Sequence, residues 1–163
     1  MQRVVDTNVA IVANGRQTHA SPDCRLAAIE FLNGLIDRGK IILDLAGDMQ
    51  EEYHRHLNPD GQPGVGDRFF LVVLNSAPRR VVRIDLPKDG STGVYRDFPS
   101  DPALARFDPS DRKFAAAARQ TGQPVANATD SDWLDHKVAL NANGIAVDFV
   151  CGCNRQFWSN DGS

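Results

Sequence analysis

Acidic side chains occur where the predicted strands of this 163-residue chain end. Asp6 closes a predicted N-terminal strand, and Asp130 and Asp132 follow a strand predicted at residues 123–128. Asp111 lies in the first turn of the helix that precedes this second strand. Because ligand sites of parallel sheets lie at the carboxyl ends of the strands, we expect these carboxylates to converge at that edge.

Carboxylates held close together repel one another and raise each other's pKa unless a cation lies between them. Oxygen-rich sites of this kind suit Mg²⁺ or Mn²⁺, which keep several waters and leave room for phosphate oxygens. Such a site can activate water and stabilise the charge of an in-line displacement at phosphorus. The spacing of the acids therefore indicates metal-dependent phosphodiester hydrolysis.

Each acid also has an ordinary structural explanation. Asp6 and Asp130 could cap the helices that follow them. Asp111 lies three residues after Asp108, where an acid near a helix N-terminus interacts well with the helix dipole. Taken singly, each acid is more readily explained by capping. Several acids that converge on one sheet edge are less easily explained in that way.

The pair Glu51 and Glu52 offers a further acid on a predicted helix. Met49, Tyr53 and Leu57 share one face of that helix by their spacing. At about 100° per residue, Glu51 points away from this face and Glu52 lies at its flank. We therefore predict Glu52 as the ligand and Glu51 as a solvent-facing residue.

Strands and helices alternate along the chain. Apolar or β-rich runs predict strands at residues 2–6, 40–44, 79–86, 123–128 and 145–150. Apolar or amphipathic runs predict helices at residues 23–38, 47–57, 67–77, 112–120 and 131–143, with a strand as the alternative at residues 67–77. Ser21 suits the N-cap of the first helix, and Gly39, Gly122 and Gly144 each end one. The alternation favours an α/β fold with a parallel sheet between helices.

No linker or repeat divides the chain, so we expect one domain at residues 1–150 and an irregular tail at residues 151–163. The composition, 42% hydrophobic and 24% charged, excludes a disordered or collagen-like chain. The longest apolar run, residues 69–74, is far shorter than the roughly 20 residues of a membrane helix. It suits a buried core or the face of a homodimer.

The cysteine content and the N-terminus predict the compartment. The N-terminal residues contain no apolar segment of the kind found in secretory signals. Three cysteines, Cys24, Cys151 and Cys153, are an odd and sparse set. We therefore expect a cytoplasmic protein in a reducing environment rather than a scaffold held by disulfides.

The net charge of −3 neither favours nor excludes a nucleic-acid partner. The acids are 18 Asp and only 3 Glu, an excess that caps, turns and codon usage explain in part. If Asp6, Glu52, Asp111 and Asp130 are set aside as metal ligands, the charge of the remaining chain moves from −3 to +1. The mild acidity is thus accounted for by the predicted site.

Four segments together carry a resemblance to a known family. They are Val4-Val5-Asp6-Thr7-Asn8-Val9, Glu51-Glu52-Tyr53, Asp108-Pro109-Ser110-Asp111-Arg112-Lys113-Phe114 and Asn127-Ala128-Thr129-Asp130-Ser131-Asp132-Trp133. In this order and spacing, from residue 2 to about residue 150, the chain resembles the PIN-domain nucleases. The resemblance implies a three-layer α/β/α sandwich with a central, mostly parallel, twisted sheet.

The resemblance also implies roles for individual residues. Asp6, Glu52, Asp111 and Asp130 would bind Mg²⁺ or Mn²⁺, and Asp132 would support these ligands or add another. Thr7 or Asn8 would orient Asp6 or touch phosphate. From their place beside Asp111, Arg112 and Lys113 are expected to meet the substrate backbone. Two features depart from a minimal member: the doubled glutamate and the long segment at residues 87–107.

By this resemblance the chain is expected to be a metal-dependent endoribonuclease that cleaves RNA, or single-stranded DNA, and leaves a 5′-phosphate. Family members include toxins held by an antitoxin and defence nucleases, so an antitoxin or an ATPase is an expected partner. The alternative is an inactive nucleic-acid-binding or scaffold module in which the acids serve as caps. A phosphatase of similar topology is disfavoured, because it requires a second Asp where the chain has Asn8.

Overall fold

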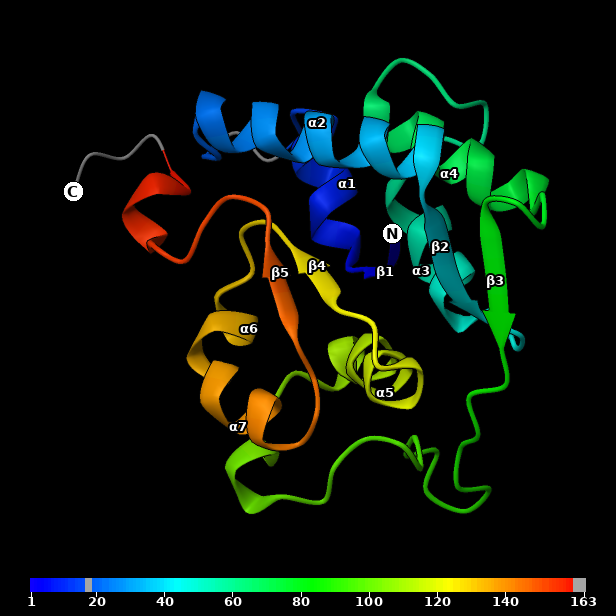
Figure 1. Ribbon diagram of the computed structural model, residues 1–163, viewed down its shortest axis with the longest axis vertical. Helices are drawn as coiled ribbons and strands as arrows, with labels where there is room; N and C mark the ends of the chain where they lie inside the picture. Colours follow the sequence, from blue (N-terminus) through cyan, green and yellow to red (C-terminus); the bar gives the residue numbers. More distant parts are fainter. Residues whose placement is uncertain (17–18, 160–163) are drawn as a thin grey trace.

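Five parallel strands form one sheet at the centre of the molecule (Figure 1), in the order β3-β2-β1-β4-β5. The computed structural model describes residues 1–16 and 19–159. The strands are β1 (Gln2–Val5), β2 (Lys40–Asp44), β3 (Val81–Ile84), β4 (Val125–Asn127) and β5 (Val147–Phe149). The prediction of a parallel sheet is confirmed.

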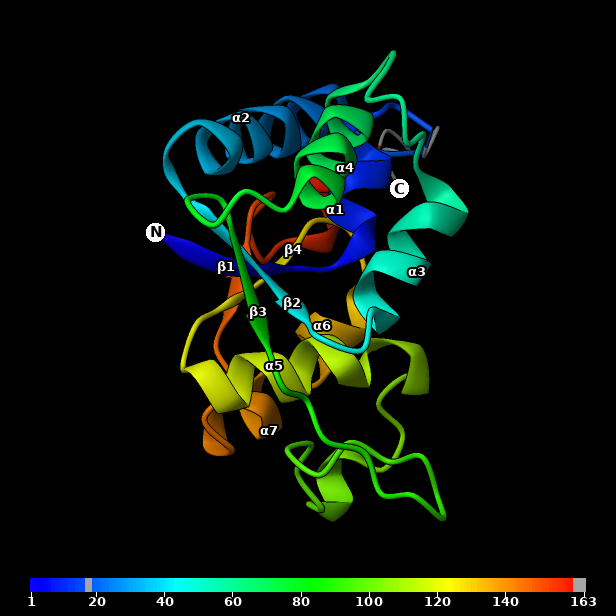
Figure 2. The ribbon, with the colours of Figure 1, turned by 90° about the vertical axis from the view of Figure 1, so that its right-hand side faces the viewer.

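Helices cover both faces of this sheet. They are α1 (Thr7–Ala13), α2 (Pro22–Arg38), α3 (Asp48–His56), α4 (Val65–Asn75), α5 (Arg112–Thr121), α6 (Ser131–Asp135) and α7 (Lys137–Ala142). Figure 2 shows α1, α2 and α4 on one side of the sheet and α5, α6 and α7 on the other. Three short 3₁₀ turns complete the elements: η1 (Pro102–Leu104), η2 (Pro109–Asp111) and η3 (Arg155–Phe157). The predicted three-layer α/β/α sandwich is therefore confirmed.

The register of the central strand decides which residues meet at the carboxyl edge. β1 lies between β2 and β4, and Val5 pairs with Ala126. The amide of Asp6 then donates to the carbonyl of Ala126 at 3.1 Å, just beyond the end of β1. The next residue of each strand therefore emerges at one edge, which brings Asp6 beside the loop that follows Asn127.

Apolar side chains hold the layers together. Ile41, Ile42 and Leu43 of β2 are completely buried, as expected of a strand covered on both faces. The apolar run in α4 is helical, and its Phe69 and Phe70 are also completely buried. This run therefore belongs to the core.

Several predicted helix ends are confirmed. The hydroxyl of Ser21 accepts a hydrogen bond from the amide of Cys24 at 3.1 Å, and so caps α2. Gly39 is the C-cap of α2. Gly122 has φ of +69° at the end of α5, a conformation that glycine adopts without a steric penalty.

The predicted helix at residues 131–143 is wrong in one respect, because it breaks at His136 into α6 and α7. His136 has φ of −102° and ψ of 10°, outside the helical range. Its backbone amide donates to the carbonyl of Asp132 at 3.1 Å, and its ring Nδ1 lies 2.9 Å from the same oxygen. The side chain of His136 thus folds back onto α6 and shares this carbonyl with its own backbone amide.

The predicted strand at residues 79–86 is shorter than expected, because β3 begins at Val81. Arg79 and Arg80 therefore precede the strand. The guanidinium of Arg80 donates to the carbonyls of Asp37 and Gly39 at the end of α2. This arginine satisfies carbonyl groups that the helix terminus leaves open.

The prediction that the cysteines remain reduced is wrong for two of them. Cys24 and Cys151 form a disulfide, and Cys153 is an exposed free thiol. The first turn of α2 and the segment after β5 are neighbours in space, which their sequence separation of 127 residues does not reveal.

The described part of the C-terminal tail packs against the start of α2. The amide of Ser21 donates to the carbonyl of Trp158 at 2.8 Å, and the hydroxyl of Ser21 donates to the carbonyl of Phe157 at 2.7 Å. Trp158 is only 4% exposed. Within the described residues, no helix combines the length and the apolar composition that crossing a membrane requires.

Candidate metal centre

Three carboxylates from three elements come together at the carboxyl edge of the sheet. Asp6 follows β1, Asp130 follows β4, and Asp111 ends the η2 turn before α5. One oxygen from each of the three lies within 4.8 Å of the others. Asp6 and Asp111 are buried, and Asp130 is partly buried. The predicted convergence of these acids is found in the structure.

Two asparagines join the strand ends that carry Asp6 and Asp130. The Nδ2 of Asn8 donates to Oδ1 of Asn127 at 2.9 Å. The Oδ1 of Asn8 accepts from the amides of Ala128 at 2.8 Å and Thr129 at 3.1 Å. Asn127 is completely buried, and its Nδ2 donates to the carbonyl of Asp130 at 3.1 Å. Asn8 thus orients the loop after β4 by its hydrogen bonds to Asn127, Ala128 and Thr129.

Asp6 serves both as a helix cap and as a member of the acidic group. Its Oδ1 accepts from the amide of Asn8 at 3.0 Å, which caps α1. Its Oδ2 accepts from the indole Nε1 of the fully buried Trp133 at 2.7 Å. A carboxylate oxygen has about two lone pairs, so each oxygen can still accept another contact. The capping role and the ligand role are therefore compatible.

Asp111 is the least satisfied of the three acids. It is 6% exposed, and its Oδ2 is buried without a hydrogen-bond partner in the described chain. Burial, the charge of Asp6 and a hydrogen bond with Asp130 raise the pKa of Asp111 far above its ordinary value. Without a cation, this carboxyl therefore keeps its proton at neutral pH.

Asp6 is affected in the same direction. Burial, followed by the charge of Asp130, raises the pKa of Asp6 to about 6. The hydrogen bonds from Asn8 and Trp133 oppose this rise, because they stabilise the ionised form. Both pKa shifts reflect negative charges crowded in a poorly solvated place.

The donor set fits a hard divalent cation. Three carboxylates provide only oxygen ligands, which Mg²⁺ and Mn²⁺ prefer. The buried Oδ2 of Asp111, which has no protein partner, is the kind of atom that a bound ion would satisfy. Asp6, Asp111 and Asp130 are therefore the residues that would hold such an ion.

Glu52 is close to this group without belonging to it. Its Oε1 lies 3.0 Å from the Nζ of Lys113, and its Oε2 accepts from the hydroxyl of Thr7. Its side chain is 14% exposed, whereas Glu51 is exposed and pairs with Arg55 at 2.9 Å. The sequence prediction correctly separated the inward-facing glutamate from the outward-facing one. Glu52 contacts the chain's own hydroxyl and ammonium groups.

Hydrogen bonds anchor helix α3, which carries Glu52, to the ends of β1 and β2. The carboxylate of Asp44 accepts from the amides of Asp48 at 2.8 Å and Met49 at 3.0 Å. The hydroxyl of Tyr53 donates to the carbonyl of Val5 at 2.6 Å. Asp44 and Tyr53 therefore fix the position of Glu52 beside the end of β1.

Asp132 supports the site from a distance. Its Oδ2 accepts from the amide of Asp108 at 2.7 Å, and its Oδ1 lies 3.1 Å from the ring Nδ1 of His136. It is not among the three grouped acids. The bond to Asp108 instead ties α6 to the turn that presents Asp111, so Asp132 positions that turn.

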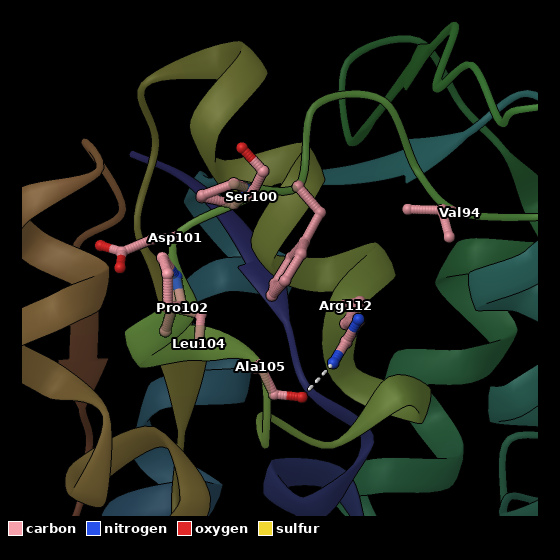
Figure 3. A pocket seen from close by; sticks show the side chains of 9 residues that line it. Val94, Ser100, Asp101, Pro102, Leu104, Ala105 and Arg112 are labelled. Atoms are coloured by element: carbon pink, nitrogen blue, oxygen red, sulfur yellow. Dashed lines mark hydrogen bonds between the residues drawn. The ribbon is translucent and has the colours of Figure 1, made fainter.

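Arg112, which was expected to meet the substrate backbone, contacts the protein's own carbonyl groups. Its guanidinium donates to the carbonyls of Ala105 at 3.1 Å and Phe107 at 3.0 Å. It also lies over the ring of Phe98, 4.8 Å from the centroid. Figure 3 shows Arg112 reaching toward Ala105 at one wall of a cavity of about 220 Å³. Arg112 therefore holds the long segment in place.

Asp48 binds the other part of the long segment. Its Oδ2 accepts from the Nζ of Lys88 at 2.8 Å and from the hydroxyl of Tyr95 at 2.6 Å. Burial acts to raise the pKa of Asp48, but the bonds from Lys88 and Tyr95 outweigh it and lower the pKa overall. No pattern in the sequence predicts this contact. An acid in the first turn of a helix is so common that nothing marked it.

Comparison with known proteins adds no further assignment: no family model, curated protein or solved structure matches the chain.

Proposed function

We propose that the chain is a metal-dependent endoribonuclease of the PIN-domain type. The observation that carries the proposal is the unpartnered, buried Oδ2 of Asp111 within 4.8 Å of oxygens of Asp6 and Asp130. A polar atom buried without a hydrogen-bond partner costs about 1–3 kcal/mol, so such an atom supports the inference of a missing ligand. The choice of RNA as substrate rests on the four sequence segments that resemble the family.

Asp6, Asp111 and Asp130 are the proposed ligands of Mg²⁺ or Mn²⁺. The bound ion would lower the pKa of a water molecule and neutralise charge on the phosphate. Asp111 gives up its proton as the ion binds, because a ligand carboxylate must be ionised. Asn8 and Trp133 each donate to one oxygen of Asp6, and each oxygen keeps a lone pair for a further contact.

The geometry assigns supporting tasks to other residues. Asn8 and Asn127 keep the ends of β1 and β4 together, so the distance between Asp6 and Asp130 does not depend on a bound ion. Asp132 holds the turn that carries Asp111. A site built in this way keeps its ligands in place before the substrate arrives.

The proposal is tested by incubating end-labelled single-stranded RNA and DNA with the protein in Mg²⁺, Mn²⁺ or EDTA. We expect cleavage of RNA with either metal, products bearing a 5′-phosphate, and no cleavage in EDTA. Asp6→Asn, Asp111→Asn and Asp130→Asn should each lower the rate by at least about a hundredfold. The control is Asp60→Asn, an exposed acid outside the group, which should cleave like the wild type.

Two results would contradict the proposal. Equal cleavage by Asp111→Asn and the wild-type protein would show that the activity arises elsewhere. RNA binding without cleavage under every metal condition would favour a binding module without catalytic activity.

A further inference from the structure

An enclosed ion pair borders the candidate metal centre. The Nζ of Lys113 lies 3.0 Å from Oε1 of Glu52 and also donates to the carbonyl of Ser110. The two side chains are 10% and 14% exposed. Placing two charges in so little solvent is costly and rarely improves stability over an apolar pair. This ion pair is therefore better explained by the site beside it than by stability.

Both oxygens of Glu52 are used by the protein itself. Thr7 donates to Oε2, and Lys113 occupies Oε1. Asp111 is the opposite case, since its Oδ2 is buried without a partner. Glu52 is therefore satisfied by the protein, whereas Asp111 is open to a ligand. Both acids nevertheless come from segments that resemble ligand segments of one family.

The three grouped aspartates and Glu52 differ in whether a cationic side chain neutralises them. Within the described residues, no cationic side chain forms a hydrogen bond or ion pair with Asp6, Asp111 or Asp130, whereas Glu52 is neutralised by Lys113. The negative charge of Glu52 still reaches Asp6, whose pKa it helps to raise. A second divalent ion at Glu52 would have to displace the ammonium group, or share the place with it against electrostatic repulsion.

We propose that the ammonium group of Lys113 takes the place of a second divalent cation, so that the centre binds one ion. This inference rests on the proposed metal centre. Asp6, Asp111 and Asp130 hold the single ion, and Glu52 is a positioning residue that holds Lys113. The ammonium then provides a fixed positive charge at the border of the site, of the sign that a phosphate group requires.

The number of bound ions tests this inference without any measurement of activity. Mn²⁺ is titrated into metal-free protein by calorimetry, and electron paramagnetic resonance then reports whether bound Mn²⁺ ions are close enough to couple. We expect one Mn²⁺ per wild-type chain and an uncoupled spectrum. Lys113→Met removes the charge and retains most of the side-chain length, so Oε1 of Glu52 loses its partner, and we expect two coupled ions.

Two glutamate variants complete the design. Glu52→Gln should still bind one Mn²⁺, with an affinity lowered by less than about tenfold, because Glu52 is not a ligand. Asp111→Asn should lose more than about a hundredfold. The double variant with Lys113→Met and Glu52→Gln should return to one ion, because no acid remains for the second.

The outcomes separate the inference from the proposed function. Two ions in the wild-type protein would overturn the inference and leave the metal-dependent nuclease intact, whereas no ion at all would overturn both. One ion in a folded Lys113→Met variant would also overturn the inference. If that variant does not fold, Glu52→Gln decides: a loss as large as that of Asp111→Asn contradicts the inference, and a small loss supports it.

Discussion

A single oxygen atom distinguishes this site from an ordinary set of helix caps. Asp6 and Asp130 both accept the hydrogen bonds of N-cap residues, so either could be explained by the helix that follows it. Oδ2 of Asp111 has no such use. A polar atom buried without a partner costs about 1–3 kcal/mol, and more when it is charged. The cost is understandable if the atom serves a ligand.

Substitution of Asp111 should therefore have opposite effects with and without metal. In EDTA at pH 7 we expect Asp111→Asn to be more stable than the wild type by about 1–3 kcal/mol, because an amide donor replaces a crowded carboxyl. With Mn²⁺ the wild type should gain stability and the variant should not. Thermal melts in EDTA and in Mn²⁺ measure both effects.

Asp60→Asn is the control for that experiment, because Asp60 is exposed in the loop before α4. It should change the melting temperature little in EDTA and keep the full gain with Mn²⁺. A destabilised Asp111→Asn variant that still responds to Mn²⁺ would contradict the assignment of this residue.

The raised pKa values of the buried acids predict an unusual pH dependence. The pKa of Asp6 rises from 3.8 to about 6 on folding, so its contribution to stability is complete below pH 3.8 and is lost as the pH rises through 6. Asp111 acts in the same direction. Asp48, whose pKa is lowered, contributes stability that is lost only as the pH falls below its ordinary value.

Metal-free protein should therefore lose stability between pH 4 and pH 7, by an amount on the order of 3 kcal/mol from Asp6. Urea unfolding in EDTA at several pH values measures this slope. Asp6→Asn should make the slope smaller, and Mn²⁺ should oppose it because the ion binds the ionised acids. A stability that rises over this pH range in the wild type would refute the prediction.

At the scale of elements, the site depends on how closely α1 approaches α4. Gly66 in α4 faces the backbone of α1: a Cβ there would overlap the carbonyl oxygen of Ala10 and lie 2.8 Å from its carbon. Helix α1 begins immediately after Asp6. The contact between these helices therefore helps to set the position of Asp6, a proposed ligand.

Gly66→Ala should destabilise the protein by about 2 kcal/mol or more, because backbone atoms of α1 would have to move. Gly34→Ala is the matched control within a helix. A Cβ at Gly34 meets only the end of the Arg38 side chain, at 3.8 Å, so this change should stabilise by up to about 1 kcal/mol. Chemical denaturation compares the two variants, and equal effects would contradict the close approach.

Asn8 links two further elements, the start of α1 and the loop after β4. Asn8→Ala would leave the amides of Ala128 and Thr129 without their acceptor, at a cost of about 2–4 kcal/mol. It should also weaken Mn²⁺ binding by about tenfold or more, because Asp130 follows that loop. The control is Asn75→Ala at the exposed end of α4. Unfolding and Mn²⁺ titration of both variants measure the two effects.

At the scale of the whole molecule, the disulfide joins the first turn of α2 to the segment after β5. Because Cys24 and Cys151 are separated by 127 residues, the bond restricts the unfolded chain strongly. Reduction, or replacement of both cysteines by serine, should lower the free energy of unfolding by about 2–4 kcal/mol. Cys153→Ser, at the exposed thiol, should change it by less than about 0.5 kcal/mol. Urea unfolding with and without reductant gives both values.

The proposed binding of Mn²⁺ should survive this reduction if the protein remains folded. The disulfide and Asp111 belong to different layers of the molecule. Cys24 lies in α2, whereas Asp111 precedes α5, which covers the other face of the sheet (Figure 2). Loss of Mn²⁺ binding in the reduced, folded protein would show a coupling that these contacts do not explain.

Local patterns in the sequence determined most elements and the convergence of three acids. Apolar runs and the capping residues Ser21, Gly39 and Gly122 act within a few neighbours, so they can be interpreted along the chain. The alternation of strands and helices then implies a parallel sheet, whose carboxyl edge collects the residues after each strand. Asp6 and Asp130 could be predicted in this way, and Asp111 because the helix that precedes β4 begins at the same edge.

Only the tertiary structure decided which side chains neutralise one another. The pairing of Lys113 with Glu52, the contact of Arg112 with the 98–107 segment and the Cys24–Cys151 disulfide join residues that no local periodicity relates. A charged or reactive side chain takes the partner that packing brings within about 3–4 Å. That distance depends on how α3, α5 and the sheet are stacked, which is a property of the whole fold.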